Sequence, residues 1–261
     1  VASADGACVR LWSVEGRKRI LTLKAQNGRP ELHGGGVTCL DIDADQLLSG
    51  GGDGALHMYD LAEDEISASI RGIAAGAVSD CLLLRGSARA RAVSSDTTGC
   101  VRLWDAAGGE VAELLPRLGG GELVPVPLSV SGERLLVARG RQALMFDLRP
   151  EVEQFRINLA DPGTVAACCF GGEGGQVFYT SQTGSGSIAC WDARVGIRGP
   201  PIGEMPLLHS TADAGFSAAP PGVAFRSADC ARRLSSDGAR LFAAVDDEEG
   251  GSAFARAAAS L

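Results

Sequence analysis

The chain has 261 residues, of which 45% are hydrophobic and 21% are charged, so it can bury a substantial core. Its net charge of −8 at pH 7 argues against the broad basic surface that direct nucleic-acid binding requires. No apolar run approaches the roughly 18 residues that a membrane-spanning helix needs, and no basic segment followed by an apolar one marks a secretory signal.

One short phrase recurs along the chain: an apolar residue, an aromatic residue and then usually aspartate. It occurs as Leu11-Trp12-Ser13, Met58-Tyr59-Asp60, Leu103-Trp104-Asp105, Met145-Phe146-Asp147 and Cys190-Trp191-Asp192. Successive aromatic residues are 47, 45, 42 and 45 positions apart, which is the blade length of a WD-repeat β-propeller. The 36 glycines, about twice the average share of roughly 7%, favour many tight turns between short strands.

The residues around each phrase predict strands and hairpins. Each repeat opens with an apolar run, and a glycine-containing turn such as Asp5-Gly6 or Asp53-Gly54 precedes the aromatic phrase. The chain begins inside the second strand of a blade, and no segment keeps a 3.6-residue period. We therefore predict an all-β fold: a WD-repeat β-propeller with about six recognisable blades of four antiparallel strands, the first of them incomplete.

The predicted propeller is a single domain over residues 1–261. Its blades span residues 1–24, 37–70, 78–115, 123–159, 164–194 and 226–261, and the Gly/Pro-rich segment 195–225 is predicted to be a loop. Trp191 and Phe254 are 63 residues apart, which is more than one blade and less than two. Either this segment is an insertion, or a seventh blade is degraded or missing there.

The recurring aromatic residues are predicted to be architectural. One four-stranded blade cannot bury both of its faces alone, so blades stack around an axis and the third-strand aromatic fills the gap between neighbours. This role is assigned to Trp12, Tyr59, Trp104, Phe146 and Trp191. Ser94 and Asp96 are expected to bond towards the Trp104 N–H, and His33 is the one histidine placed to join such a network.

The sequence offers no group of residues that predicts catalysis. The eight cysteines have no CxxC spacing and mostly lie in apolar runs, so we expect buried reduced thiols and a nuclear or cytoplasmic location. Alternation places the adjacent Cys168 and Cys169 on opposite faces of a strand. Histidines 33, 57 and 209 lack metal-ligand spacing, and the loose glycine motifs at 50–55 and 184–189 precede strands, not helices. We predict no enzyme activity, no cofactor, no metal and no small-molecule substrate.

Several phrases resemble a particular propeller family. Residues 48–61, 101–105, 128–149 and 235–245 are similar, in order, to the second, third, fourth and last blades of the spindle-checkpoint propeller family. That family is the kinetochore partner of the "budding uninhibited by benzimidazole" kinases and is related to the messenger-RNA export propeller. The resemblance implies a seven-bladed ring that binds a short peptide motif of checkpoint kinases and phosphorylated repeats of a kinetochore scaffold.

The chain departs from this family in two motifs, and the family's sixth blade is largely missing from the pattern. Ala2-Ser3-Ala4-Asp5 stands where the family has Ser-Ser-Trp-Asp, so an exposed tryptophan anchor is absent. The segment Pro206–Ser210 lacks the positive charges of a basic family phrase, and phosphopeptide recognition uses such charges.

We therefore predict a non-catalytic protein–protein interaction scaffold, with a spindle-checkpoint or kinetochore adaptor as the specific form. The alternative is a generic WD-repeat adaptor, such as a ubiquitin-ligase substrate receptor or a trafficking or RNA-export subunit. The predicted partners are other proteins, through short peptide motifs on the face that carries the turns between second and third strands. Those turns contain Asp5, Asp53, Asp96, Arg139 and Arg141, and the two arginines suit carboxylates or phosphates of a peptide.

Overall fold

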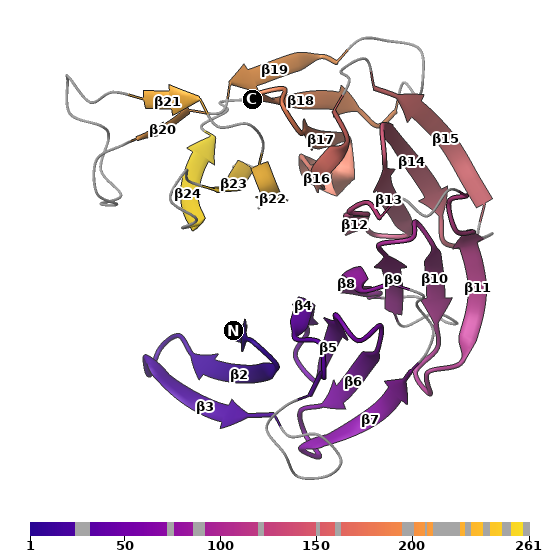
Figure 1. Cartoon of the computed structure of the whole chain (residues 1–261), viewed down its shortest axis with the longest axis vertical. Coiled ribbons are helices and arrows are strands. Elements are labelled where there is room, and N and C mark those ends of the chain that lie inside the picture. The colour runs from indigo at the N-terminus through magenta and orange to yellow at the C-terminus, as the bar shows by residue number, and fades with distance from the viewer. Residues whose placement is uncertain are drawn as a thin grey trace. The chain divides into compact units, whose positions relative to one another are not determined.

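The computed structural model describes residues 1–23, 32–71, 76–85, 92–119, 123–149, 152–159, 163–194, 201–206, 208–210, 225–227, 231–236, 241–246 and 252–257. These residues form 24 β-strands and one short 3-10 turn, Glu173–Gly175 (Figure 1). The predicted all-β fold class is therefore confirmed. No helix in these segments is long and apolar enough to cross a membrane. The chain divides into two compact units: residues Val1–Leu128 with Asp147–Val152, and residues Ser129–Phe146 with Glu153–Leu261.

The first unit contains three antiparallel sheets whose strands pair in chain order. The first sheet consists of β1 (Ala2–Asp5), β2 (Cys8–Ser13) and β3 (Lys18–Thr22). The second consists of β4 (Val37–Ile42), β5 (Gln46–Gly51), β6 (Leu56–Asp60) and β7 (Glu65–Ile70). The third consists of β8 (Val78–Leu83), β9 (Ala92–Asp96), β10 (Val101–Trp104) and β11 (Glu110–Leu115). The second and third sheets span the residue ranges predicted for two blades.

The second unit contains most of the fourth sheet and all later ones. The fourth sheet is β12 (Leu128–Ser131), β13 (Arg134–Arg139), β14 (Gln142–Asp147) and β15 (Val152–Asn158). The fifth is β16 (Val165–Gly171), β17 (Val177–Gln182), β18 (Ser187–Asp192) and β19 (Gly203–Pro206). A two-stranded sheet, β20 (Leu208–Ser210) and β21 (Phe225–Ser227), precedes the last sheet of β22 (Ala231–Ser236), β23 (Leu241–Asp246) and β24 (Ser252–Ala257).

The loop predicted for residues 195–225 is wrong in part, because β19, β20 and the first residue of β21 lie within it. Strand β19 pairs with β18 and becomes the fourth strand of the fifth sheet. Without β19, one edge of β18 would leave its backbone groups without partners in the sheet. The prediction failed because Gly and Pro bound this four-residue strand closely, so turn signals dominate the sequence around it.

Neighbouring sheets within each unit share apolar clusters, and three of the third-strand aromatics, Tyr59, Trp104 and Trp191, belong to them. Tyr59 is in one buried cluster with Leu11 of the first sheet, and Trp104 is in another with Met58 of the second sheet. In the second unit, Trp191 is in one cluster with Met145 of the fourth sheet. In each case the aromatic shares a cluster with a residue of the preceding sheet. That residue, Leu11, Met58 or Met145, comes directly before the preceding sheet's third-strand aromatic in the sequence.

Three indole N–H groups make the same cross-strand bond. Trp12 donates to Ser3 Oγ at 2.7 Å, Trp104 to Ser94 Oγ at 2.9 Å, and Trp191 to Thr180 Oγ1 at 2.9 Å. In the third sheet Ala92 lies directly opposite Trp104, and the acceptor Ser94 is two residues further along β9. In the fifth sheet Phe178 lies directly opposite Trp191, and the acceptor Thr180 is two residues further along β17. The bond satisfies the N–H inside an apolar contact and confirms that these tryptophans occupy equivalent positions.

We expect the Trp104→Ala variant to lose about 3–5 kcal/mol of unfolding free energy, because it removes a buried indole and leaves a cavity between two sheets. Urea titration followed by circular dichroism measures this loss. Trp12→Ala is the matched control, because Trp12 makes the same hydrogen bond but is 39% exposed, against 2% for Trp104. Equal losses in the two variants would show that contact between sheets does not set the cost.

Candidate interaction face and its buried polar network

Two of the predicted binding aspartates hold their own turns together. Asp53 Oδ2 accepts the Gly34 N–H at 2.8 Å, and its Oδ1 accepts the Ala55 N–H at 3.2 Å. Asp96 is 4% exposed, and its Oδ1 accepts the N–H groups of Thr98 and Cys100 together with the Thr98 hydroxyl. The hydrogen bonds of Asp96 in the described residues lie within its own turn. The predicted bond from Asp96 towards Trp104 is therefore wrong, because Ser94 Oγ accepts the Trp104 indole N–H.

Asp5 and the two turn arginines are placed differently. Asp5 ends β1 with its side chain 74% exposed, and its Oδ2 lies 2.8 Å from Arg10 Nη1 on the neighbouring strand. Arg139 and Arg141 flank Gly140, whose φ of 61° closes the two-residue turn between β13 and β14. Arg139 is half-buried and Arg141 is exposed, with Arg141 Nη2 3.5 Å from the Leu159 carbonyl oxygen.

The backbone of the arginine turn is held from two sides. The Leu159 N–H donates to the Arg141 carbonyl at 2.9 Å, and the Val165 N–H donates to the Gly140 carbonyl at 2.7 Å. These two donors follow β15 and begin β16, so the turn is fixed to its own sheet and to the next one. A turn held in this way presents its side chains from a defined backbone, which lowers the entropy lost on binding a ligand.

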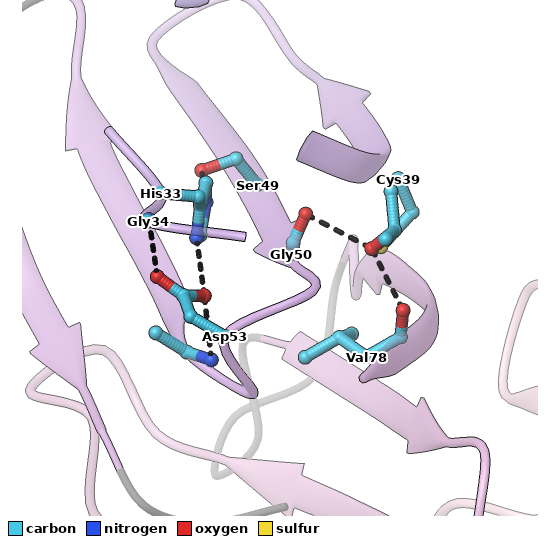
Figure 2. A network of polar contacts seen from close by, with 9 residues as sticks. His33, Gly34, Cys39, Ser49, Gly50, Asp53 and Val78 are labelled. Carbon is cyan, nitrogen blue, oxygen red and sulfur yellow. Dashed lines mark hydrogen bonds and ion pairs between the residues drawn. The ribbon is translucent and has the colours of Figure 1, made fainter. Parts of the chain in front are cut away.

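A buried histidine connects the Asp53 turn of the second sheet to Ser49 on β5 of the same sheet (Figure 2). His33 Nδ1 lies 3.1 Å from Asp53 Oδ1, and its Nε2 lies 2.9 Å from Ser49 Oγ. This confirms the prediction that His33 joins a polar network, although the third-strand aromatic here is Tyr59, whose hydroxyl donates to Asp64 instead. Glycine is required at position 51, because a Cβ there would lie 2.2 Å from His33 Nδ1.

Burial and hydrogen bonding shift the pKa values of Asp53, His33 and the neighbouring His57. Burial would raise the pKa of the Asp53 carboxyl, but hydrogen bonds from Gly34, His33 and Ala55 outweigh it and hold that pKa below its usual value. Burial lowers the pKa of His33. The His57 ring lies 4.7 Å from the His33 ring, and its Nδ1 is buried without a hydrogen-bond partner. Burial, together with His33 and Arg71, lowers the pKa of His57 to about 4.

These histidines predict acid sensitivity of the second sheet. In the unfolded chain the pKa of His57 returns to 6.5, so between pH 6.5 and about 4 the unfolded chain binds a proton that the folded chain does not. The unfolding free energy is therefore complete above pH 6.5 and falls as the pH drops towards 4. Denaturant titrations across this range measure it.

The His57→Leu variant should show a shallower fall in this range, because one titrating group is gone. Asp53 does not obscure the comparison, since its contribution is lost only below the usual carboxyl pKa of 3.8. A pH profile identical to that of the parent protein would contradict the role of His57.

Polar side chains on β4, β8 and β12 make hydrogen bonds to the sheet that follows, and the sequence alone did not predict these bonds. Thr38 Oγ1 on β4 lies 2.7 Å from the Val78 carbonyl oxygen on β8 and 3.1 Å from that of Gly50, oxygens visible in Figure 2. Asp41 Oδ2 accepts the Leu83 N–H at 2.8 Å. The same type of bond runs from Val126 N–H to Ser79, Leu128 N–H to Asp80 and Phe170 N–H to Ser129.

The signal for these contacts was present in the sequence. The first strands β4, β8 and β12 each have hydroxyl or carboxylate residues among apolar ones, as in Val37-Thr-Cys-Leu-Asp-Ile42. A polar side chain in such a strand indicates a hydrogen bond to a neighbouring element.

We expect Asp80→Ala to lower the unfolding free energy by about 1–3 kcal/mol, because it leaves the buried N–H groups of Cys81 and Leu128 without their acceptors. Chemical denaturation measures the change. Asp45→Ala, at an exposed turn residue, is the control and should stay within about 0.5 kcal/mol of the parent. A loss no larger than that of Asp45→Ala would show that the Asp80 contact adds nothing.

The described thiols are buried and poorly ionisable. The seven described cysteines are free, and all but Cys8 are buried. Burial raises the pKa of Cys100 and of Cys169 to about 12. Cys168 and Cys169 do face opposite ways, but each belongs to an apolar cluster, since β16 is buried on both faces. Cys230 and the side chain of His209 lie outside the described residues, in which no three His, Cys, Asp or Glu side chains are grouped to hold a metal.

Comparison of the structure with solved structures supports this architecture. The chain superposes on a chain of the structure entitled "Crystal Structure of Mitotic Checkpoint Complex" with a TM-score of 0.69, covering 98% of this chain and 72% of that chain. The chain has a WD-repeat β-propeller fold. The two sequences are 14% identical, so the likeness concerns the fold. No family model and no curated protein matches the sequence.

Proposed function

We propose that this propeller is a non-catalytic scaffold that binds short peptide segments of other proteins at the turn between β13 and β14. The observation that carries the proposal is the arginine turn itself. Arg139 and Arg141 stand two positions apart on a backbone that is hydrogen-bonded to β16 and to the end of β15, in a protein of net charge −8. Guanidinium groups suit carboxylates and phosphates, and a fixed backbone reduces the cost of ordering them.

The other polar groups support the same interpretation. Asp53, Asp96 and His33 make hydrogen bonds within their own sheet and its turns, so these groups stabilise the fold. Burial raises the pKa of thiols such as that of Cys169, which keeps them in the uncharged form. Arg139, Arg141 and Asp5 have exposed or half-buried side chains at the turns, so they stay in the binding hypothesis as contact residues. Asp53 and Asp96 act in it by shaping their turns.

The finer part of the proposal is a role as spindle-checkpoint or kinetochore adaptor, acting in the nucleus or cytoplasm. Two independent features support it. The ordered blade phrases resemble the spindle-checkpoint propeller family, and the fold is similar to that of a chain in a mitotic checkpoint complex. The partner would then be the peptide motif of a checkpoint kinase.

The test is the double variant Arg139→Glu with Arg141→Glu, titrated with a fluorescent peptide that carries the propeller-binding motif of a checkpoint kinase. Reversal of two charges at the binding turn should weaken binding at least about tenfold. Fluorescence anisotropy measures the affinity, and circular dichroism checks that the fold is intact.

The matched control is Arg149→Glu with Arg194→Glu. Both arginines are exposed and follow the third strands β14 and β18, and each pairs with the aspartate two residues before it. Affinity that stays unchanged in the Arg139/Arg141 variant would remove this turn from the binding site. If the parent protein does not bind the kinase peptide but co-purifies with ligase, trafficking or RNA-export subunits, the result favours the generic adaptor.

A further inference from the structure

One of the five recurring phrases ends in a residue other than aspartate. Ser13 follows Trp12, whereas aspartate follows the third-strand aromatic in the other four phrases. Each of those aspartates accepts backbone N–H groups of the turn after its strand, so a carboxylate at this position caps the turn. The bonds run to Asp60 from Ala62 and Glu63, to Asp105 from Ala107 and Gly109, to Asp147 from Arg149, and to Asp192 from Arg194.

Ser13 makes the same kind of contact through a neutral hydroxyl group. Its Oγ accepts the Gly16 N–H at 2.9 Å, and Asp60 Oδ1 likewise accepts the N–H three residues further on, at 3.1 Å. The two turns also share an unusual backbone feature, because the fourth residue after the capping residue has a positive φ in both: Arg17 at 46° and Asp64 at 55°. The first turn therefore has the geometry of an aspartate-capped turn without the charge of the aspartate.

Lysine lies beside the Ser13 hydroxyl. Lys18 is directly across from Ser13 on β3, at the position where Glu65 lies across from Asp60 in the second sheet. The two side chains also line the same space beside Gly16, since a Cβ added there would lie 3.1 Å from Ser13 Oγ and 3.5 Å from Lys18 Cε. A negative charge on Ser13 would therefore form an opposite-charge pair across the strands.

The charge of the whole turn is opposite to that of its counterpart. Residues 14–19 contain three basic side chains and one acidic side chain, whereas residues 61–65 contain three acidic side chains and no basic one. The second turn therefore combines a carboxylate cap with acidic neighbours, and the first combines an uncharged cap with basic neighbours. An anionic group on Ser13 would gain from the basic neighbours what Asp60 cannot gain in its own turn.

Ser13 stands at an accessible corner of the first sheet. It is the last residue of β2, its side chain is half-buried, and residues 14–17 after it are exposed. This exposure does not depend on which sheet packs against the first one. Residues 62–65 of the matching turn are also exposed, although the second sheet shares apolar clusters with described sheets on both sides.

The sequence before Ser13 suits a kinase that recognises arginine. Arg10 precedes Ser13 by three positions, and kinases select their substrates partly by such charge patterns. The spacing by itself does not select Ser13, because it recurs before Thr22, Ser94, Ser235 and Ser236. Ser13 is distinguished by its place in the repeat, where the other phrases carry a carboxylate, and by the basic side chains around it.

We infer that Ser13 is a phosphorylation site for an arginine-directed serine/threonine kinase, and that its phosphate caps the first turn as aspartate caps the others. The kinase transfers the γ-phosphoryl group of ATP: a bond forms between Ser13 Oγ and the γ-phosphorus, the bond from that phosphorus to the β–γ bridging oxygen breaks, and ADP and the serine proton are released. At pH 7 the phosphate carries a charge of about −1.5 to −2, and basic neighbours supply charge-assisted hydrogen bonds to it. The inference does not depend on peptide binding at the Arg139–Arg141 turn.

The first test is phosphorylation of the folded full chain by ATP and a purified kinase that selects arginine three residues before serine, with mass spectrometry to locate the phosphate. Ser13 should be modified, and Arg10→Ala should slow its modification at least about tenfold. Ser94 is the internal control, because it has the same spacing but is 6% exposed, and it should stay unmodified. Phosphate found at other positions, with Ser13 unmodified, would overturn the inference.

The second test measures the capping role by amide hydrogen exchange at Gly16, followed by nuclear magnetic resonance. Phosphorylation of Ser13 should slow this exchange at least about threefold, and Ser13→Asp should slow it in the same direction. Ser67→Asp is the control, because it adds the same charge at an exposed residue of β7, and it should leave the Gly16 rate unchanged.

Lys18→Gln should reduce the slowing that phosphorylation causes, because it removes the charge directly across from Ser13. Exchange at Gly16 that is the same before and after phosphorylation would overturn the capping role. A Ser13→Asp variant keeps this test available even where the kinase modifies only part of the sample.

Discussion

Burial of both faces of a thin antiparallel sheet is the constraint on which the described structure depends. A single meander of three or four short strands has too little core of its own, so its apolar faces must pack against neighbouring sheets. The third-strand aromatics supply much of that contact: Trp104 packs with Met58, and Trp191 with Met145. Their N–H groups would be costly to bury alone, and Ser94 and Thr180 accept them.

The same constraint explains why polar side chains lie between neighbouring sheets and in their turns. A buried strand edge or turn needs partners for its backbone groups, and side chains on adjacent sheets provide them. Asp80 accepts an N–H from the start of β12, and Asp53 holds its turn to the His33 segment. Groups that serve as bases or ligands in other proteins thus take part here in joining sheets.

The arginine turn differs from these residues, because its two guanidinium groups stand on a backbone anchored by hydrogen bonds and lie at the end of a hairpin. Under the proposed function, such a turn suits a carboxylate or phosphate ligand.

The repeat spacing in the sequence was enough to predict an all-β propeller, the ranges of the second and third sheets and the equivalence of the three tryptophan positions. The residues around the phrases also predicted that His33 joins a polar network. These features are local, because strand alternation and hairpin turns depend on neighbouring residues. Strand β19 escaped prediction because turn residues surround it, and the role of Asp96 was misassigned because its nearest donors lie in its own turn.

The bonds from Thr38, Asp41 and Asp80 to the next sheet, and the exposure of Trp12, followed only from the tertiary structure. Trp12 and Trp104 occupy the same place in the same motif and make the same hydrogen bond. They differ in burial because that depends on which sheet lies against each ring, a contact between segments that no local pattern encodes.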